Sequence, residues 1–513
     1  MASALFRWPF SMFNEDGAGH NDHDDGLQHL RDALEKAERQ VSSSTSDSEE
    51  ERERKEEILD GFRAKLEEFE VETQKRVKIT ICSAVSGEAI AQVRLRPTDF
   101  IVHLCEAVVK ETGQKDVVSH SIIFQSEVLP QHKTLNEAGL QDGDTVYVTR
   151  APVRCLTASH DGTACLWNFE QDSPSSTSEP RCGEPVRLRS GGALKNATMS
   201  PEGQLLMLST EDGGSGQLYC ADTFRFLHKL QGGAASASFS LDGKRVVGVD
   251  ADGAANIWCA HTGKTLHKMF PPKPSSSDVG SDSEDEFEMA FAVLSRCGAF
   301  AVTGAGSCAQ IWDSCGNLQH TLQGHSGTVR HAAFSADSQY VLTASADATA
   351  RIWSCSSGRC VCVLRGHQRA LHLCAFSPTG AQAITAAHDG SLKMWDLTDA
   401  PTDGSCLECS WTLEADGNVV SSACFSPEGS RLLVACGSET VRMFNVSTGQ
   451  AQMSFGGLHD DWVRYASFSP DGLIIATTSY DGAVGIWSAT TGKCLHALRG
   501  HTQAVVVAQL AAA

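Results

Sequence analysis

The sequence of 513 residues has no apolar run long enough to cross a membrane, and Arg7 and Pro9 interrupt its opening segment before signal-peptide length. We therefore expect an intracellular protein, cytoplasmic or nuclear, without a membrane partner. The sequence is also poor in positive charge, with 42 Lys and Arg residues against 63 Asp and Glu residues and a net charge of −21. Phosphate backbones repel such a chain, so we expect no direct nucleic-acid binding.

Motifs for catalysis and metal binding are missing as well. No Gly-x-Ser-x-Gly elbow occurs, and Gly263-Lys264-Thr265 lacks the leading glycine of a phosphate loop because Trp258 stands there. The pair Cys406 and Cys409 has no second pair to complete a zinc site, and the 19 scattered cysteines indicate reduced thiols. We expect a protein that is not an enzyme and has no cofactor or metal.

The first 75 residues differ from the rest of the chain in composition. Residues 1–25 predict a disordered acidic tail, and apolar residues spaced by three and four predict a helical arm over 26–75. A polar break interrupts this arm, where Ser46 and Ser48 precede acidic residues and suit phosphorylation by an acid-directed kinase, with a plain solvated linker as the alternative. The arm is compatible with an antiparallel hairpin, a surface helix, or a coiled coil for partner binding or self-association.

Residues 76–150 predict a compact α+β module with a hairpin, one helix and two further strands. This module resembles ubiquitin on features that follow in the same order: the hairpin, Pro97-Thr98-Asp99, Ile122-Ile123-Phe124, Thr134-Leu135 and Asp142-Gly143-Asp144. The resemblance maps a partner-binding patch onto Val85, Ile123 and Tyr147. No diglycine tail follows Arg150, so we expect a built-in docking domain and not a conjugated modifier.

Residues 151–513 are dominated by an internal repeat. A turn of the type Phe-Ser-Pro-Asp-Gly recurs, and an aromatic residue follows it at a constant distance in most copies. Three copies add histidine, threonine and aspartate at fixed offsets from the tryptophan: His325, Thr343, Asp347, Trp353; His367, Thr385, Asp389, Trp395; His459, Thr477, Asp481, Trp487. These residues match the WD-repeat family, and this resemblance implies the four-stranded blades of a β-propeller.

Each quartet predicts a buried hydrogen-bond chain from the tryptophan indole to the threonine hydroxyl, then to the imidazole, then to the carboxylate. A Ser/Thr-His-Asp catalytic site is the alternative, but recurrence at one register favours a structural tetrad. A fourth tetrad is divided between the ends of the repeat region, with Thr157, Asp161 and Trp167 at one end and His501 at the other. We therefore expect the segment Gln503 to Leu510 to complete a sheet built from residues 153–190, which closes the ring.

The aromatic strand ends predict eight blades, and seven blades with one degenerate repeat remain the alternative. The predicted fold is thus mainly β: a WD40-type propeller closed by its C-terminal strand, after a ubiquitin-like domain and an acidic helical arm. The loops before the first strand of a blade place Arg330, Arg369, Trp462 and Arg464 as candidate partner contacts, with core packing as the alternative for Trp462. An insertion near this face carries Ser281 and Ser283 as further candidate phosphorylation sites.

These features favour a non-catalytic scaffold that binds protein partners through its propeller loops and its docking domain. One alternative is a substrate receptor of a ubiquitin ligase. Another is a ribosome-assembly factor similar to the Notchless family, whose ubiquitin-like domain presents a glutamate to an ATPase. That resemblance would assign the same partner-binding role to Glu127.

Overall fold

The computed structural model describes residues 77–512 with gaps at 98, 113–117, 130–132, 170–184, 202, 212–215, 231–236, 241, 250–253, 271–290, 399, 401–403 and 415–417. The described chain forms two compact units. Unit 1 comprises 77–108 and 122–147, and unit 2 comprises 109–121 and 148–512. The acidic tail and the helical arm, including its self-association, lie outside the described residues, as do Ser46, Ser48, Ser281 and Ser283.

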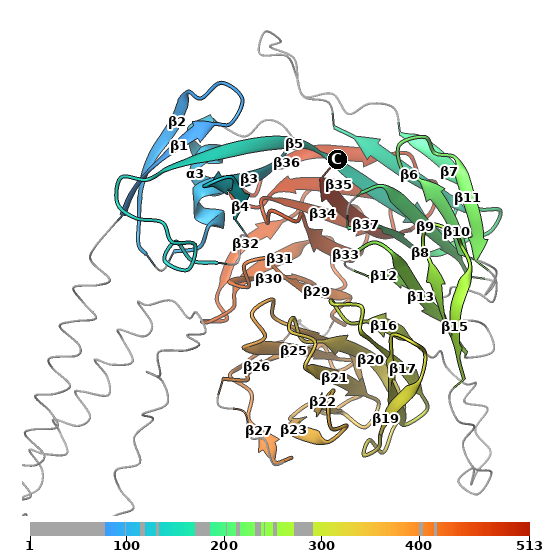
Figure 1. Cartoon of the computed structure of the whole chain (residues 1–513). Helices are drawn as coiled ribbons and strands as arrows, with labels where there is room; N and C mark the ends of the chain where they lie inside the picture. Colours follow the sequence, from blue (N-terminus) through green and yellow to red (C-terminus); the bar gives the residue numbers. More distant parts are fainter. Residues whose placement is uncertain are drawn as a thin grey trace, which may run out of the picture. The chain divides into compact units, whose positions relative to one another are not determined.

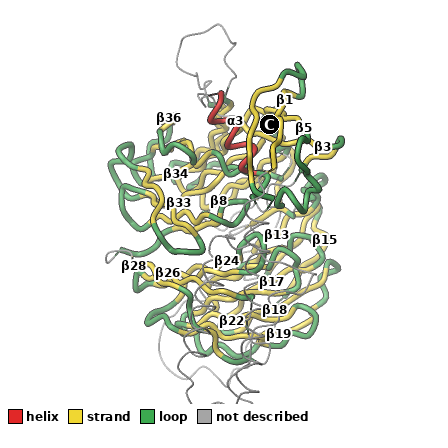
Figure 2. Tube along the Cα trace, turned by 90° about the vertical axis from the view of Figure 1, so that its left-hand side faces the viewer, coloured by secondary structure: helices red, strands yellow, loops and turns green. Residues whose placement is uncertain are grey.

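The first part of the described chain holds the one described helix, drawn in red in Figure 2, and a small mixed sheet. Its elements are β1 (Val77–Ser83), β2 (Ala89–Leu95), α3 (Val102–Thr112), β3 (Val118–Phe124), β4 (Glu127–Val128) and the beginning of β5 (Thr145–Ser159). The strands lie in the order β2-β1-β5-β3-β4. The side chains of Ile79, Ile81, Leu104 and Val108 are fully buried and form part of its core.

The described residues of unit 2 form eight sheets of antiparallel strands (Figure 1). Seven of these sheets contain only strands of unit 2, whereas sheet 1 includes β5, which begins in unit 1. Sheet 1 contains β37 (Val505–Ala512), β5, β6 (Thr163–Asn168) and β7 (Val186–Arg189). The next three are sheet 2 with β8 (Leu194–Met199), β9 (Leu205–Thr210), β10 (Gly216–Cys220) and β11 (Phe226–Leu230); sheet 3 with β12 (Ala237–Phe239), β13 (Arg245–Val249), β14 (Ala255–Cys259) and β15 (Thr265–Met269); and sheet 4 with β16 (Ala292–Leu294), β17 (Phe300–Ala305), β18 (Cys308–Asp313) and β19 (Leu318–Leu322).

The remaining four sheets follow the same plan. They are sheet 5 with β20 (Val329–Phe334), β21 (Tyr340–Ser345), β22 (Thr349–Ser354) and β23 (Cys360–Arg365); sheet 6 with β24 (Leu371–Phe376), β25 (Gln382–Ala387), β26 (Ser391–Asp396) and β28 (Trp411–Glu414); sheet 7 with β29 (Ser422–Phe425), β30 (Arg431–Ala435), β31 (Val441–Asn445) and β32 (Ala451–Phe455); and sheet 8 with β33 (Val463–Phe468), β34 (Ile474–Ser479), β35 (Ala483–Ser488) and β36 (Cys494–Arg499). In addition, β27 (Cys406–Leu407) pairs in parallel with β23 at the edge of sheet 5.

The first strands of consecutive sheets touch one another in a closed cycle. Contacts run from β8 to β12, β16, β20, β24, β29 and β33, and from there through β37 back to β8. Each sheet is therefore covered on both faces by its neighbours. This cover explains why β34 and β35 are buried along their whole length.

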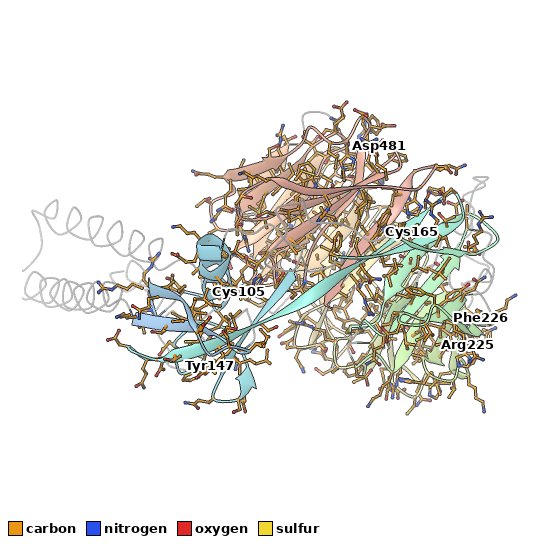
Figure 3. All side chains as sticks on the ribbon, turned by 90° about the horizontal axis from the view of Figure 1, so that it is seen from above. Cys105, Tyr147, Cys165, Arg225, Phe226 and Asp481 are labelled. Carbon is orange, nitrogen blue, oxygen red and sulfur yellow. The ribbon has the colours of Figure 1, made fainter. Side chains whose placement is uncertain are left out.

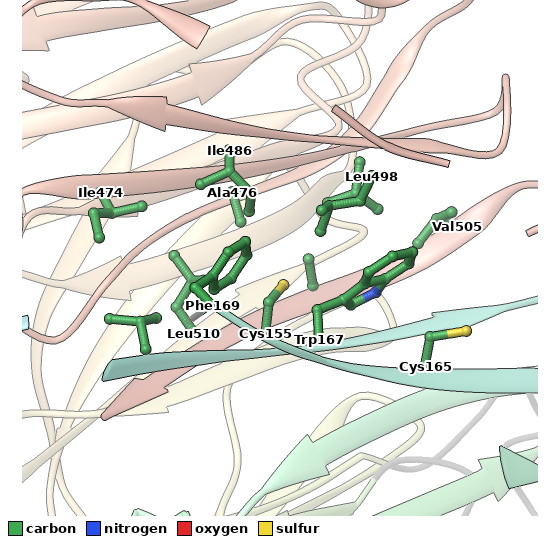
Figure 4. Close-up of a cluster of buried hydrophobic side chains, with 13 residues drawn as sticks. Cys155, Cys165, Trp167, Phe169, Ile474, Ala476, Ile486, Leu498, Val505 and Leu510 are labelled. Carbon is green, nitrogen blue, oxygen red and sulfur yellow. The ribbon is translucent and has the colours of Figure 1, made fainter. Parts of the chain in front are cut away.

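The strand from the end of the chain completes sheet 1, and this confirms the expected closure. β37 pairs antiparallel with β5 from Val505↔Ser159 to Ala512↔Val153, and β5 pairs with β6. Figure 4 shows the core behind this joint, where Trp167 and Cys155 lie in one cluster with Val505 and Leu510 and with side chains of β34, β35 and β36. The joint therefore buries apolar side chains from both ends of the repeat region.

The strand β5 continues where the sequence suggested a boundary. Residues 145–159 form one strand without a break, so the boundary expected at residues 150 and 151 falls inside it. The two units meet in sequence at Tyr147 and Val148, also within β5. In the described part of the chain, no helix has the length and apolar character needed to cross a membrane.

Candidate functional site

The predicted quartet of sheet 5 forms a continuous hydrogen-bond chain. The indole N–H of Trp353 donates to Thr343 Oγ1 at 2.8 Å, and Thr343 Oγ1 lies 2.8 Å from His325 Nε2. The other ring nitrogen, Nδ1, lies 2.9 Å from Asp347 Oδ2. Trp353 and Thr343 are buried, so the hydroxyl is closed to any substrate. The arrangement is that of an internal strut and not of a catalytic triad.

Sheet 8 repeats this chain with nearly the same geometry. Trp487 donates to Thr477 at 2.9 Å, His459 Nε2 lies 2.8 Å from the same hydroxyl, and Nδ1 lies 3.1 Å from Asp481 Oδ2. Asp481 is labelled in Figure 3. Its second oxygen accepts the backbone N–H of Ala483 at 2.7 Å, so the carboxylate fixes the turn as well as the ring.

In sheet 6, an additional hydroxyl stands between the imidazole and the carboxylate. His367 Nε2 lies 2.7 Å from Thr385 Oγ1, which accepts the Trp395 indole N–H at 2.8 Å. His367 Nδ1, however, bonds Ser391 Oγ at 2.7 Å and lies 4.0 Å from the Asp389 carboxylate. The direct imidazole–carboxylate bond expected here is thus replaced by a bond through Ser391, which donates to Asp389 at 2.6 Å.

The divided quartet of sheet 1 is brought together by the closure of the ring. His501 Nε2 lies 2.8 Å from Thr157 Oγ1, which accepts the Trp167 indole N–H at 3.0 Å. Here too a hydroxyl stands beside the carboxylate, because His501 Nδ1 lies 2.9 Å from Thr163 Oγ1 and 3.5 Å from Asp161 Oδ2. Sequence reasoning missed Thr163 and Ser391, although each occupies the second position after the turn aspartate.

The protonation of these groups follows from their burial. Burial lowers the pKa of His367 to about 4 and also lowers the pKa of His325, His459 and His501. Burial alone would raise the pKa of Asp347, but hydrogen bonds from Thr349, His325 and two backbone N–H groups lower it to about 2. Near neutral pH, a neutral imidazole therefore faces an ionised carboxylate.

A second recurrent feature lies at one end of the same strands. In five sheets the first strand carries a β-bulge directly after its first residue, where the pairing register shifts. The bulged residues are Val506, Lys195, Arg330, His372 and Arg464 in sheets 1, 2, 5, 6 and 8. Bulges redirect side chains and often flank functional sites. Four of the five redirected side chains are basic residues.

Two further positions accompany each bulge. A loop residue two places before the bulge accepts, with its carbonyl oxygen, the backbone N–H of a turn residue between the second and third strands. The loop residues are Ala504, Ala193, Thr328, Ala370 and Trp462, and the turn residues are His160, Glu211, Ala346, His388 and Tyr480, in the same order of sheets. We call these loop, bulge and turn positions together the rim.

Side chains of the rim form contacts from one sheet to the next. Arg464 donates to His160 Nε2 at 2.9 Å, and His160 Nδ1 lies 3.1 Å from Glu211 Oε1. Because arginine can only donate, His160 accepts at Nε2 and carries its proton at Nδ1. In the same manner, Arg330 donates to His388 Nε2 at 3.1 Å, and the His388 ring lies 4.8 Å from that of His372.

Three of the four candidate contacts of unit 2 thus fall on rim positions. Arg330 and Arg464 are bulge residues, Trp462 is a loop residue, and Arg369 is an exposed residue one place before a loop position. Trp462 is 57% exposed, so the alternative that it packs in the core is wrong. His372 was missed, although it stands five residues after its histidine, as Arg330 and Arg464 do.

The candidate contacts of unit 1 are accessible as well. Val85 is 96% exposed and Tyr147, labelled in Figure 3, is 43% exposed. Ile123 on β3 is half-buried, and Glu127 on β4 is exposed. Among the described residues, no group of histidine, cysteine and acidic side chains is arranged to hold a metal ion, and Cys406 and Cys409 are free thiols.

Comparison with known families connects these features to a defined repeat. Four segments match the model described as WD domain, G-beta repeat: residues 316–354, 358–396, 407–445 and 453–488. The segment 316–354 begins before β19 of sheet 4 and ends with β22 of sheet 5. Each sequence repeat therefore contains the last strand of one sheet and the first three strands of the next sheet, so that one repeat contributes to two neighbouring sheets.

Several curated proteins share parts of this region. The Small ribosomal subunit protein RACK1 of Drosophila melanogaster is 41% identical over 187 residues, which cover 36% of this chain and 56% of that protein. The Pre-mRNA-processing factor 19 homolog 2 of Arabidopsis thaliana is 32% identical over 240 residues, 46% of this chain and 34% of its own length. The Nuclear distribution protein PAC1 of Komagataella phaffii is 32% identical over 104 residues, 20% of this chain and 21% of its own length.

The chain thus spans between about a fifth and just over half of the length of these three curated relatives. The likeness therefore covers only part of each of these proteins. Four segments of this chain thus match the WD repeat, and its many four-stranded antiparallel sheets are consistent with the blades of a WD40 propeller.

Proposed function

We propose that this protein is a non-catalytic scaffold that binds protein partners through the rim of an eight-bladed propeller. The count of eight rests on the closed cycle of first strands from β8 through β37. The buried quartets supply rigidity, because each polar atom in them has a partner and an unpaired one would cost about 1 to 3 kcal/mol. A rigid frame reduces the entropy lost when its loops bind a partner.

One observation carries this proposal. The loop position of the rim is alanine or threonine in four sheets, namely Ala504, Ala193, Thr328 and Ala370, but in sheet 8 it is Trp462. A tryptophan that is 57% exposed at this position is not required by the fold. Tryptophan is enriched among the residues that dominate binding energy at protein interfaces.

Unit 1 fits the role of a second docking element. Its strand order β2-β1-β5-β3-β4, with one helix after the first hairpin, supports a ubiquitin-like domain. Its exposed Val85 and Tyr147 offer apolar contact area. Two docking elements on one chain would raise the overall affinity for a partner that engages both.

The test is a comparison of two exposed aromatic side chains in the full-length protein. We expect Trp462→Ala to remove specific partners in quantitative affinity capture from cell extract. The matched control is Tyr340→Ala, because Tyr340 is 39% exposed and lies at the other end of the strands of sheet 5, away from its bulge. If the two variants retain the same partners as the unaltered protein, the rim is not the binding surface.

A further inference from the structure

The rim of sheet 8 has a corner, formed by its loop and turn residues and by Val419 of sheet 7, that is more apolar and more exposed than the rims of the other sheets. Trp462 is 57% exposed, Tyr480 46% and Val419 of the neighbouring sheet 42%. The N–H of Tyr480 donates to the Trp462 carbonyl oxygen at 3.1 Å, which joins the backbones of these two residues. Ser421 Oγ donates to the Val463 carbonyl oxygen at 2.9 Å and ties the segment that carries Val419 to the same place.

The Arg464 guanidinium supplies the positive charge of this corner. The Arg464 guanidinium lies 5.7 Å from the centre of the Tyr480 ring and donates to Nε2 of His160. Among the described residues, no carboxylate lies within ion-pair distance of Arg464. A guanidinium has five N–H donors in a planar fork that matches a carboxylate in two parallel hydrogen bonds.

Acidic groups nearby limit what can bind there. Asp460 and Asp461 precede Trp462 and are exposed, and Glu211 lies on the far side of His160. Asp461 Oδ1 accepts the backbone N–H of Trp462 at 2.7 Å, and the N–H of Asp460 donates to Asp481 Oδ2 at 3.1 Å. These carboxylates would repel a uniformly acidic segment, so a suitable ligand presents a single carboxylate and an apolar side chain beside it.

From this arrangement we propose that Trp462, Tyr480, Arg464 and Val419 form a docking corner for a partner peptide in which an apolar side chain stands next to one carboxylate. The apolar side chain packs against Trp462 and Val419, and the carboxylate pairs with Arg464, which Tyr480 and His160 hold in place. This inference rests on the proposed scaffold function and specifies which part of the rim binds and which partner chemistry it selects.

The test uses the full-length protein and an array of short Gly/Ser peptides, each with one leucine or phenylalanine and one glutamate at varied separation. We expect at least one peptide to bind, and replacement of its glutamate by glutamine to weaken binding at least about tenfold, since an ionised acceptor strengthens the hydrogen bonds of a guanidinium. Arg464→Gln should weaken binding to a similar degree, and Trp462→Ala should weaken it further.

A matched control lies in sheet 5. Arg330 occupies the same bulge position as Arg464 and also donates to a histidine, but its loop residue is Thr328 and not tryptophan. We expect Arg330→Gln to leave peptide affinity within about twofold, because the apolar part of the corner is absent there. Unchanged melting temperatures of all three variants would show that the differences do not reflect unfolding.

The outcomes separate the two proposals. If the glutamine peptides bind as well as the glutamate peptides, or if no peptide binds, the docking corner as defined here is wrong. If Trp462→Ala nevertheless loses partners from cell extract, the rim remains the binding surface and its partner class must be different. If Trp462→Ala changes neither the peptide affinity nor the partners captured from cell extract, both proposals are wrong.

Discussion

In sheets 1, 5, 6 and 8, the buried quartet uses the same four residue types, and in sheets 5, 6 and 8 it uses them at the same spacing. The loop position of the rim, in contrast, is alanine, threonine, alanine and tryptophan in these four sheets. Both regions are parts of one repeat. The buried histidine must satisfy a hydroxyl and a carboxylate group inside the protein, so its replacement would leave polar atoms unpaired. A rim side chain faces water and is free to differ, so variation among repeats marks the residues available for binding.

The change with the largest expected effect removes β37, the strand that completes sheet 1. Deletion of residues 505–513 removes the buried side chains of Val505, Val506 and Leu510 and leaves one edge of β5 unpaired. Burial of one such side chain contributes about 1.5 to 3 kcal/mol, against a typical stability of roughly 5 to 15 kcal/mol. We expect loss of cooperative unfolding, or a large fall in the melting temperature, measured by circular dichroism.

The control for this deletion is removal of Ala513 alone, which leaves the pairs from Val505↔Ser159 to Ala512↔Val153 intact. If the protein that lacks residues 505–513 melted at the same temperature as the intact chain, β37 would not be an integral strand of sheet 1.

A second test applies one substitution to both regions. Trp353→Phe removes the indole N–H that donates to Thr343 and leaves unfilled space in the core. We expect the free energy of unfolding to fall by about 1 to 3 kcal/mol. Trp462→Phe removes an indole that is largely exposed, so we expect a change within about 0.5 kcal/mol. Urea unfolding of both variants is the measurement, and equal losses would contradict the distinction between strut and rim.

The pH dependence of stability tests the buried histidines. Burial lowers the pKa of His367 from its ordinary value of 6.5 to about 4 in the folded protein, so between these values the unfolded chain binds a proton that the folded chain does not. Stability should therefore fall as the pH drops from 6.5 to about 4. The carboxyl group of Asp347, whose pKa falls from 3.8 to about 2, adds a further loss at lower pH.

The measurement is the free energy of unfolding from urea titrations at constant ionic strength over this range. The lowered pKa values of His325, His459 and His501 act in the same direction and should steepen the decline. A stability that stayed constant between pH 6.5 and 4 would contradict buried, neutral imidazoles in the quartets.

The smallest expected effect concerns the interposed hydroxyl of sheet 6. Sheet 8 has Ala483 at the position equivalent to Ser391, and there His459 contacts Asp481 directly. Ser391→Ala should thus lower the free energy of unfolding by only about 0.5 to 1.5 kcal/mol, because the ring of His367 can approach Asp389 in the same way. The matched variant Thr385→Val removes the hydroxyl shared by the tryptophan and the histidine, and it should lower the free energy of unfolding by more than Ser391→Ala does. The reverse order in urea unfolding would show that Ser391 is essential to the quartet.

Much of the frame was predictable because it depends on spacing. The constant distance from histidine to tryptophan predicted which side chains meet, and the unpaired His501 and Thr157 predicted that the two ends of the repeat region share a sheet. Spacing reports such contacts reliably because strand pairing fixes register: a shift by one residue would turn every buried side chain toward water.

The unbroken course of β5 and the parallel pairing of β27 were not predictable, because both depend on neighbours that are distant in the sequence. The rim was predictable only in part. Sequence identified Trp462, Arg330 and Arg464 as loop-proximal residues, but not the bulges that turn the two arginines toward His388 and His160.

The amino-acid sequence by itself determined the repeat, its buried polar chains and the strand that closes the ring, since each of these follows from residue type at a fixed interval. Only the tertiary structure decided that Trp462 is exposed and that Arg464 faces an aromatic ring and a histidine. Exposure and charge environment are set by side chains from adjacent sheets, and no interval along one repeat records which residues those neighbours supply.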